Sequence, residues 1–204
     1  LAIEIDKNLA GLLKNKFKMQ KNITIINEDI LKINLDQIIS NFKFQISNFS
    51  YKVISNLPYY ITSPIIRLFL ESKFPPKEMV LMVQKEVAER IVAKPGKMSI
   101  LAVSVQYYAN SELLFCVDKS AFFPVPEVDS AVIRITHNAK RITQNSDEVK
   151  NFFRVVRAGF SAKRKVLINN LANSFHLDKK GVEERIVKIG LHPKVRDQEL
   201  RIDE

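Results

Sequence analysis

The residues Asn56-Leu57-Pro58-Tyr59 have the types and spacing that suit methylation of an amine on an aromatic base. Such an amine is a poor nucleophile because its lone pair is delocalised into the ring. The side-chain oxygen of Asn56 and a nearby backbone carbonyl can each accept one N–H, which localises the lone pair and directs it at a methyl donor. Pro58 would stiffen the loop, and Tyr59 offers a flat face on which an extruded base can stack. These residue types also form ordinary turns, so the motif alone leaves both interpretations open.

A second stretch, Phe122 to Ser130, contains Pro124 and Pro126. Two prolines at this spacing favour a stiff, extended loop that can hold an aromatic ring over a pocket. Phe122 could then cover the second face of a base stacked on Tyr59. The alternative is a proline-rich connection into the strand that follows.

Two carboxylates follow short apolar runs near the start of the chain. Glu4 ends the first run, where dinucleotide-binding α/β folds place an acidic residue on ribose hydroxyls. Asp29 follows the second run and could accept from the exocyclic amine of an adenine. Simpler explanations are a surface carboxylate for Glu4 and a turn for Asp29. The five glycines stand at positions 11, 96, 159, 181 and 190, so the sequence contains no G-x-G phosphate-binding loop. Position alone therefore favours the simpler explanation for Glu4 and makes Asp29 a weak candidate.

Alternating strand and helix patterns would position these residues. Apolar and β-branched runs predict strands over residues 1–5, 23–26, 51–55, 79–83, 113–117 and 131–135. Helices are predicted after the cap residue Asp6, from Ser63-Pro64, and over 86–93 and 101–109. Residues 35–50 give no clear prediction, and 79–83 is typical of a strand buried on both faces. This order predicts an α/β fold with a mostly parallel sheet, whose carboxyl edge, where such folds bind ligands, carries Asn56.

The predicted secondary structure changes near residue 138. Strand patterns end there, and short helices are predicted over 147–160, 164–174 and 182–189. We therefore predict an α/β domain over residues 1–137 and a helical domain over 138–204. The first has 17 basic and 13 acidic residues, net +4, and the second has 15 and 9, net +6, in half the length. The positive charge is thus concentrated in the helical part.

Five of these basic residues fall within twelve positions that contain no acid: Arg154, Arg157, Lys163, Arg164 and Lys165. On a pair of helices they would form one positive face for RNA phosphates. The alternative is a solvated helical face, which is the commoner explanation of a basic run. Asn169 and Asn170 could add polar contacts to RNA.

Composition narrows the class of protein. The chain has 204 residues, a net charge of +10, 46% apolar and 26% charged residues, which fits a globular protein rather than a disordered one. The single Cys116 excludes an internal disulfide framework and a multi-cysteine zinc site, and its place in a strand pattern predicts burial. No apolar run approaches the ~20 residues needed to span a bilayer. We expect a cytoplasmic protein with an acidic partner and no membrane association.

Several stretches together identify a family. They are IEID at 3–6, EDI at 28–30, NLPYYITSPI at 56–65, VQKEVAERIVAKPG at 83–96, FFPVPEVDSAVIRI at 122–135 and FSAKRKVLINNL at 160–171. With these the chain resembles the small-subunit ribosomal RNA adenine N6-dimethyltransferases over essentially its whole length. Those enzymes use S-adenosylmethionine to dimethylate two adjacent adenosines in the 3′-terminal hairpin of that RNA during ribosome biogenesis. The resemblance implies a Rossmann-like methyltransferase domain over 1–137 and a small, all-helical RNA-binding domain over 138–204.

The resemblance also implies roles for single residues. Glu4 would bind the ribose of S-adenosylmethionine, and Asp29 with the Ile30 backbone would bind its adenine. Asn56 would lie at both the methyl donor and the target amine, between the stacking residues Tyr59 and Phe122. No metal or strong base is implied, because the proton of the methylated amine can leave to solvent. Together with the net positive charge, the resemblance favours RNA as the ligand of the five basic residues. The expected partner is small-subunit ribosomal RNA or the assembling small subunit, and we expect the protein to be a monomer.

Two departures from the family pattern leave alternatives open. Met98-Ser99 stand where the family often has Tyr-Gly. The family's Gly-rich cofactor loop is absent, so we expect an N-terminally truncated copy that binds the cofactor poorly. One alternative is the group that dimethylates an adenine of large-subunit RNA, although Leu57 and Val128-Asp129-Ser130 favour the small-subunit group. Another is a non-catalytic RNA-binding assembly or transcription factor on a decayed methyltransferase scaffold.

Overall fold

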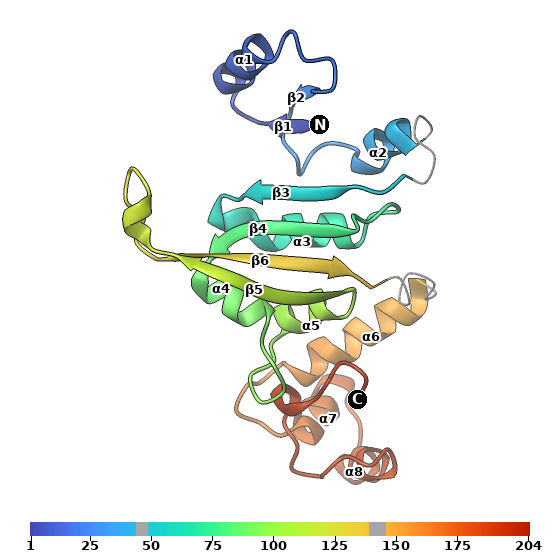
Figure 1. Cartoon of the computed structure of the whole chain (residues 1–204). Helices are drawn as coiled ribbons and strands as arrows, with labels where there is room; N and C mark the ends of the chain where they lie inside the picture. Colours follow the sequence, from blue (N-terminus) through green and yellow to red (C-terminus); the bar gives the residue numbers. More distant parts are fainter. Residues whose placement is uncertain (44–48, 139–145) are drawn as a thin grey trace.

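The computed structural model describes residues 1–43, 49–138 and 146–204 (Figure 1). Within these ranges the strands form two sheets. A two-stranded parallel sheet contains β1 (Ala2–Glu4) and β2 (Ile25–Asn27). A four-stranded sheet has the order β3-β4-β6-β5 and contains β3 (Lys52–Asn56), β4 (Glu78–Gln84), β5 (Ala109–Val117) and β6 (Ser130–His137). The alternation of strands and helices confirms the predicted α/β class.

The unit around β1 and β2 is small and weakly packed. Helix α1 (Lys7–Lys16) joins the two strands, and its predicted cap is confirmed because Asp6 Oδ1 accepts from the Leu9 amide at 2.9 Å. Within residues 1–34, Ala10 is the only buried side chain. Leu12 is 67% exposed, so the apolar face of α1 is only partly covered. The region is therefore held mainly by its backbone ladder and its turns.

Of the three strand pairings in the four-stranded sheet, one is parallel and two are antiparallel. β3 and β4 run parallel, whereas β6 pairs antiparallel with both β4 and β5. The prediction of a mostly parallel sheet is wrong for residues 109–137. No crossover helix separates β5 from β6, and consecutive strands without a crossover can pair only antiparallel.

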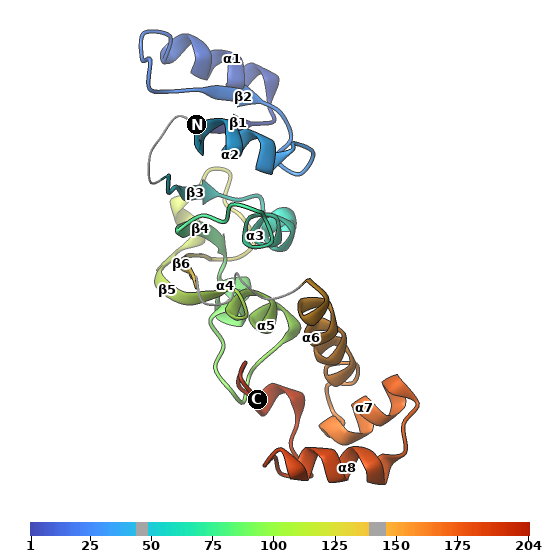
Figure 2. The ribbon, with the colours of Figure 1, turned by 90° about the vertical axis from the view of Figure 1, so that its right-hand side faces the viewer.

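Helices cover one face of this sheet. They are α3 (Thr62–Leu70), α4 (Lys85–Ile91) and α5 (Ile100–Gln106), and Figures 1 and 2 show them on the same side of the strands. Met79, Leu81 and Val83 of β4 are buried in this core, whereas the side chains between them are only half-buried. The prediction that β4 is buried on both faces is therefore wrong, because the opposite face of the sheet is open. Ile54 of β3 is 81% exposed.

Some element bounds differ from the predicted ones. Helix α2 (Leu35–Lys43) occupies much of the segment that gave no clear prediction, and the rest of that segment includes residues 44–48, which lie outside the described ones. Helix α3 begins at Thr62, so Ser63 and Pro64 lie in its first turn and Ser63 is not the cap. Cys116 is exposed rather than buried, because β5 is the edge strand of the sheet.

The C-terminal part contains the three predicted helices, α6 (Ser146–Gly159), α7 (Leu167–Phe175) and α8 (Lys179–Lys188). A small core of its own is formed by Leu167, Ile168, Ala172, Val182 and Ile186. The ring of Phe152 in α6 stacks on Tyr107 after α5 with centroids 4.4 Å apart, which joins these helices to the sheet region. Across the described ranges, no helix is long and apolar enough to cross a bilayer.

Candidate active site

The Asn56–Tyr59 loop is fixed where β3 ends. The Leu57 amide donates to the Met82 carbonyl of β4 at 3.2 Å, and the Leu57 side chain is buried in the core. Asn56, the last residue of β3, is exposed, and its side chain makes no hydrogen bond to the residues that the structure describes. The loop is thus rigid on its core side and leaves the Asn56 amide free to meet a substrate.

Tyr59 is the first residue of a 3₁₀ turn over Tyr59–Ile61 that leads into α3. Its carbonyl accepts from the Thr62 hydroxyl at 3.1 Å. Its own hydroxyl lies 2.9 Å from Ser130 Oγ, and either group can donate this bond. The ring is half-buried, so one edge is fixed while part of its surface stays accessible.

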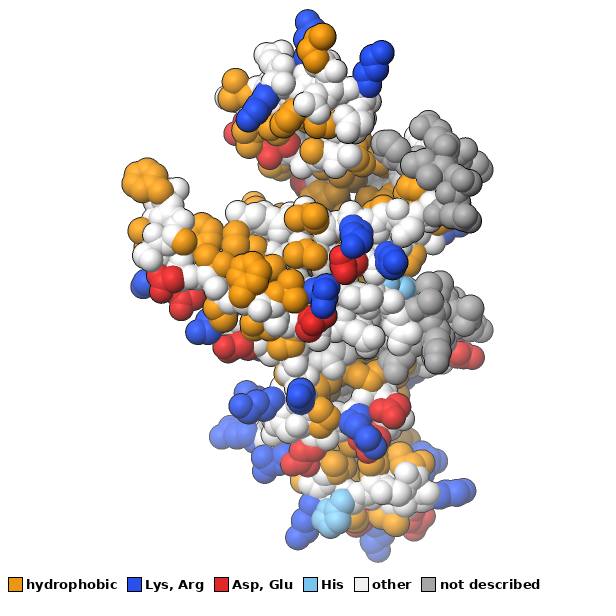
Figure 3. All heavy atoms as spheres, in the orientation of Figure 1, with side chains coloured by type: hydrophobic (Ala, Val, Ile, Leu, Met, Phe, Trp, Pro, Cys, Tyr) orange, Lys and Arg blue, Asp and Glu red, His pale blue; other side chains and the backbone are white. Residues whose placement is uncertain are grey.

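Phe122 follows a short 3₁₀ turn, Lys119–Ala121, and its amide donates to the Lys119 carbonyl at 3.2 Å. Asp118 caps the turn by accepting from the Ser120 amide at 2.8 Å. Hydrogen bonds from the Ser120 side chain and backbone lower the pKa of Asp118. Phe122 is half-buried, whereas Phe123 is fully exposed. Both belong to the connection between β5 and β6, which projects from the sheet (Figures 1 and 3).

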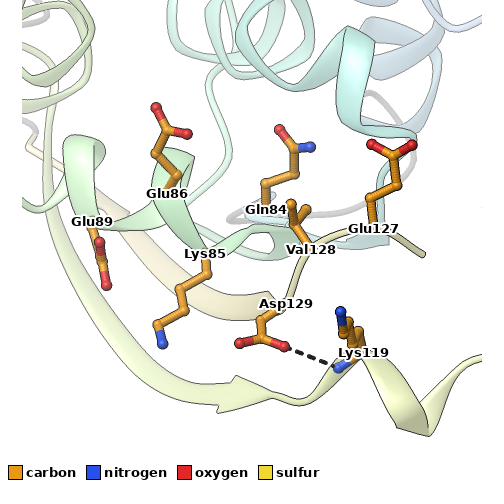
Figure 4. A pocket seen from close by; sticks show the side chains of 8 residues that line it. All are labelled: Gln84, Lys85, Glu86, Glu89, Lys119, Glu127, Val128 and Asp129. Atoms are coloured by element: carbon orange, nitrogen blue, oxygen red, sulfur yellow. Dashed lines mark hydrogen bonds between the residues drawn. The ribbon is translucent and has the colours of Figure 1, made fainter. Parts of the chain in front are cut away.

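Asp129 joins this loop to two other segments. Its Oδ1 accepts from the Lys119 amide at 3.2 Å, and its carbonyl accepts from the Lys85 amide at the start of α4 at 3.0 Å. Beside it lies an open cavity of about 400 Å³ (Figure 4), lined by Gln84, Lys85, Glu86, Glu89, Lys119, Glu127, Val128 and Asp129. Its lining carries charges of both signs and includes none of the predicted site residues.

Ser130 and Asp129 were not among the residues predicted to form the site. The available signal was their place at the end of the proline loop, within the stretch that resembles the family. No sequence pattern indicated that Ser130 pairs with Tyr59, because 71 positions separate the two residues.

Glu4 and Asp29 lie at or just beyond the carboxyl ends of β1 and β2. Glu4 Oε1 accepts from the Asp6 amide at 2.8 Å, and its carbonyl accepts from Asn27 Nδ2 at 2.8 Å. Asp29 Oδ1 accepts from the Leu31 amide at 3.0 Å, and its Oδ2 lies 3.8 Å from Lys32 Nζ. Both carboxylates thus shape local turns, which is the simpler explanation of Asp29, whereas Glu4 is half-buried rather than a fully exposed surface carboxylate. Each carboxylate has further acceptor sites, so these bonds leave room for a ligand.

The acceptors present fit S-adenosylmethionine in part. A carboxylate at Glu4 suits a ribose diol, and a carboxylate at Asp29 suits an adenine amine. The described sheets do not share a ladder, so the pair Glu4 and Asp29 lies on a different sheet from Asn56. Among the described residues, no group of three or more His, Cys, Asp and Glu side chains could hold a metal ion.

The five predicted RNA-binding residues are all exposed, and none forms an ion pair with a carboxylate in the described ranges. Arg154 lies over the Phe175 ring, 5.2 Å from its centroid. Lys163, Arg164 and Lys165 lie in the connection between α6 and α7. Figure 3 shows basic side chains gathered over the helical end of the molecule.

Asn170 is not available to RNA. Its side chain is 2% exposed, and its Nδ2 donates to the Gly159 carbonyl and to the Ala162 carbonyl, the latter at 3.2 Å. From its buried position, Asn170 therefore holds in place the connection that carries Lys163 to Lys165. A buried amide is satisfied by backbone groups in this way when no water reaches it.

Solved structures with the same arrangement of helices and strands show the fold of the chain. The 23S rRNA methyltransferase ErmE superposes with a TM-score of 0.72 at 23% identity, covering 98% of this chain and 76% of that one. A dimethyladenosine transferase from Plasmodium falciparum superposes with a TM-score of 0.75 at 22% identity, covering 98% and 77%. The chain has the α/β fold of these methyltransferases.

Sequence comparison narrows the class to a family. Residues 1–199 match the profile described as ribosomal RNA adenine dimethylase. The ribosomal RNA small subunit methyltransferase A of Dehalococcoides mccartyi is 41% identical over 204 residues, all of this chain and 68% of that protein. The protein of the same name from Bacillus cytotoxicus is 41% identical over 209 residues, covering all of this chain and 70% of its own length. The chain belongs to the ribosomal RNA adenine dimethylase family, which confirms the predicted resemblance.

Proposed function

We propose that this protein uses S-adenosylmethionine to dimethylate the N6 amines of two adjacent adenosines in the 3′-terminal hairpin of small-subunit ribosomal RNA. The observation that carries the proposal is the Asn56–Tyr59 loop, tied to β4 through Leu57 and presenting an unbonded Asn56 amide at the end of β3. The two relatives named above, 41% identical, are both called small-subunit methyltransferases. Such an enzyme would act in the cytoplasm, as a monomer, on RNA of the assembling small subunit.

The chemistry needs an extruded adenine between two surfaces and an acceptor for its amine. In the proposal, Tyr59 and Phe122 stack on the two faces of the base, as enzymes that act on an extruded base do. The Asn56 side-chain oxygen accepts one N–H of the amine, which localises its lone pair. The proton lost on methylation passes to solvent, because Asn56 is exposed. S-Adenosylmethionine, when bound, supplies the methyl group.

Cofactor binding is assigned to the ends of β1 and β2 together with Asn56. Glu4 would accept from the ribose hydroxyls of the cofactor, and Asp29 with the Ile30 backbone would hold its adenine. The Glu4 backbone supports this assignment, because Asn27 Nδ2 and the Glu28 amide both donate to its carbonyl and fix the turn. Asn56 would contact the methyl donor.

RNA binding is assigned to the helical part, residues 138–204, with residues 1–137 as the methyltransferase domain. The support is that Arg154, Arg157, Lys163, Arg164 and Lys165 are exposed and free of carboxylate partners in the described ranges. Protein recognition of folded RNA relies largely on its shape and backbone. A phosphate-binding face of this kind places the target hairpin without reading its sequence.

Transfer of labelled methyl groups to isolated ribosomal subunits tests the substrate. The chain should be expressed with whatever residues its gene encodes before Leu1, and label should enter the small subunit at two adjacent adenosines. Label only in the large subunit would overturn the choice of substrate. Retained binding without any transfer would favour the non-catalytic RNA-binding factor.

The salt dependence of binding tests the RNA face. Replacing Arg164 and Lys165 by glutamine should weaken hairpin binding and reduce the slope of log K against log salt by about 0.7 to 0.9 per lost phosphate contact. Lys73→Gln is a matched control, because Lys73 is an exposed lysine that follows α3, outside the helical part. An unchanged slope in the double variant would remove both residues from the phosphate-binding face.

A further inference from the structure

Two adjacent residues, Asp129 and Ser130, join the segments that carry the two stacking residues. Ser130 bonds to the Tyr59 hydroxyl, and Asp129 bonds to the turn that leads to Phe122. We propose that this pair positions Tyr59 and Phe122 relative to each other and so sets the slot for the target base. The inference rests on the proposed function, because it takes Tyr59 and Phe122 as the stacking residues.

Ser130 is a rigid point of attachment. It is the first residue of β6, is 1% exposed, and lies between Gln84 of β4 and Val117 of β5 in the ladder. A residue with a neighbouring strand on each side cannot shift without breaking both ladders. Its hydroxyl therefore gives Tyr59 a fixed partner 2.9 Å away.

The bond to Ser130 restricts the Tyr59 ring. The backbone turn fixes where the Tyr59 side chain starts, but a half-buried side chain can still choose among staggered rotamers. The direction that the ring takes in the structure brings its hydroxyl to 2.9 Å from Ser130 Oγ, and the bond favours that direction. The neighbouring Tyr60 shows the contrast, because it is 85% exposed and its hydroxyl has no hydrogen-bond partner among the described residues.

Asp129 supplies the second half of the arrangement. Its Oδ1 accepts from the Lys119 amide, and the Lys119 carbonyl in turn accepts from the Phe122 amide. Its own carbonyl accepts from the Lys85 amide, which fixes Asp129 to the end of β4. The attachment points of the two aromatic residues are thus one peptide bond apart. The slot is set before a base enters, so little ordering remains to be done on binding.

Steady-state kinetics of a double-mutant cycle tests the inference. We expect Ser130→Ala and Tyr59→Phe each to lower kcat for methyl transfer by about tenfold, because misplacement of a reacting group is costly. The two changes remove the same bond, so the double variant should lose no more than either single one. Ser130→Thr keeps the hydroxyl and should restore most of the rate. Fully additive losses, or Ser130→Thr as slow as Ser130→Ala, would overturn the inference.

Ser111→Ala is the matched control. Ser111 is a half-buried serine of β5 whose hydroxyl donates to the Ile91 carbonyl at 3.2 Å. It belongs to the same sheet but has no bond to either loop. It should leave kcat unchanged, and a loss equal to that of Ser130→Ala would assign the effect to general loosening of the sheet.

A measurement without methyl transfer separates this inference from the proposed function. With 3-fluorotyrosine in place of the five tyrosines, the signal missing from Tyr59→Phe identifies Tyr59 in ¹⁹F spectra. Ser130→Ala should shift and narrow that signal and leave the other four unchanged. An unchanged Tyr59 signal would overturn the inference even in an active enzyme. If Ser130→Ala makes the Tyr59 ring mobile but the parent protein methylates no RNA, the proposed function is overturned and the positioning bond stands.

Discussion

The β1–β2 unit and the four-stranded sheet both present candidate site residues at strand ends, but they fix them differently. Glu4 and Asp29 bond to amides two positions away along the chain. Tyr59, which follows β3, bonds to Ser130 of β6, 71 positions away, with β4 between the two strands. Ala10 is the only buried side chain within residues 1–34, whereas β4 and β6 contribute a continuous buried core. The proposed cofactor residues depend on local turns, and the proposed base residues depend on the folded sheet.

This difference predicts which kinetic constant each region controls. Local turns can present a carboxylate to a ligand without a large core, so changes at Glu4 or Asp29 should alter ligand affinity. The geometry of the base slot combines distant segments, so changes there should alter the rate of the chemical step. Four measurements test whether the two regions differ in this way.

The largest effect is expected at Asn56. Asn56→Ala removes the acceptor for the target amine and should lower kcat by roughly 10²–10³-fold, the usual loss when one preorganised polar group is removed. RNA binding should be unchanged, because Asn56 is a single exposed side chain away from the basic residues. Asn110→Ala, an exposed asparagine of β5, is the control. A normal rate for Asn56→Ala would remove Asn56 from the site.

Hydrogen exchange compares the stability of the two regions directly. Amides of β1 and β2 should exchange on the order of 100-fold faster than those of β4 and β6, because regions with few buried apolar contacts open locally at low cost. Mass spectrometry of peptides from each region measures the ratio. Equal protection in both would contradict the division.

Glu4→Gln tests the cofactor side. The amide keeps an acceptor for the Asp6 backbone but loses the charge, and hydrogen bonds to charged groups contribute about 1.5–3 kcal/mol. We expect KM for S-adenosylmethionine to rise roughly 10- to 100-fold while kcat at saturation stays near normal. The exposed neighbour Glu28→Gln serves as control. A fall in kcat with unchanged KM would place Glu4 at the chemical step instead.

The smallest effect is expected in acid at Asp118. Its bonds with Ser120 place its folded pKa below the ordinary value of 3.8. The stabilisation is therefore complete above pH 3.8 and is lost as the pH falls through the lowered pKa. Asp118→Asn should show a slightly lower Tm than the parent at pH 5, with the difference shrinking toward pH 2. A difference independent of pH would contradict this role for the carboxylate.

Local features of the fold were predictable from sequence. The Asp6 cap follows from a side chain that bonds three residues ahead, and β3 ending in the Asn56 loop follows from an apolar run followed by turn formers. The three C-terminal helices follow from residue spacing alone. Each of these features is decided within a few residues.

Features that depend on distant segments were not predictable. The Tyr59–Ser130 bond exists only because β6 pairs with β4, and the residues near Tyr59 in the sequence do not indicate that pairing. The burial of two residues was predicted wrongly for the same reason. Cys116 looked like a core residue and is exposed on an edge strand, whereas Asn170 looked like a surface residue and is buried among backbone carbonyls.

The single peptide bond between Asp129 and Ser130 has a consequence for insertions and deletions. One added residue between them would displace Asp129, because Ser130 is paired with both neighbouring strands and a register shift would turn the buried side chains of β6 to its other face. Ser130 would then keep its bond to Tyr59, while Asp129 would lose its bonds to Lys119 and Lys85. The exposed segment from Phe123 to Val125 lies between the two attachment points of the loop and could change length without disturbing either. Natural variation in loop length should therefore concentrate at that tip and stop before Asp129.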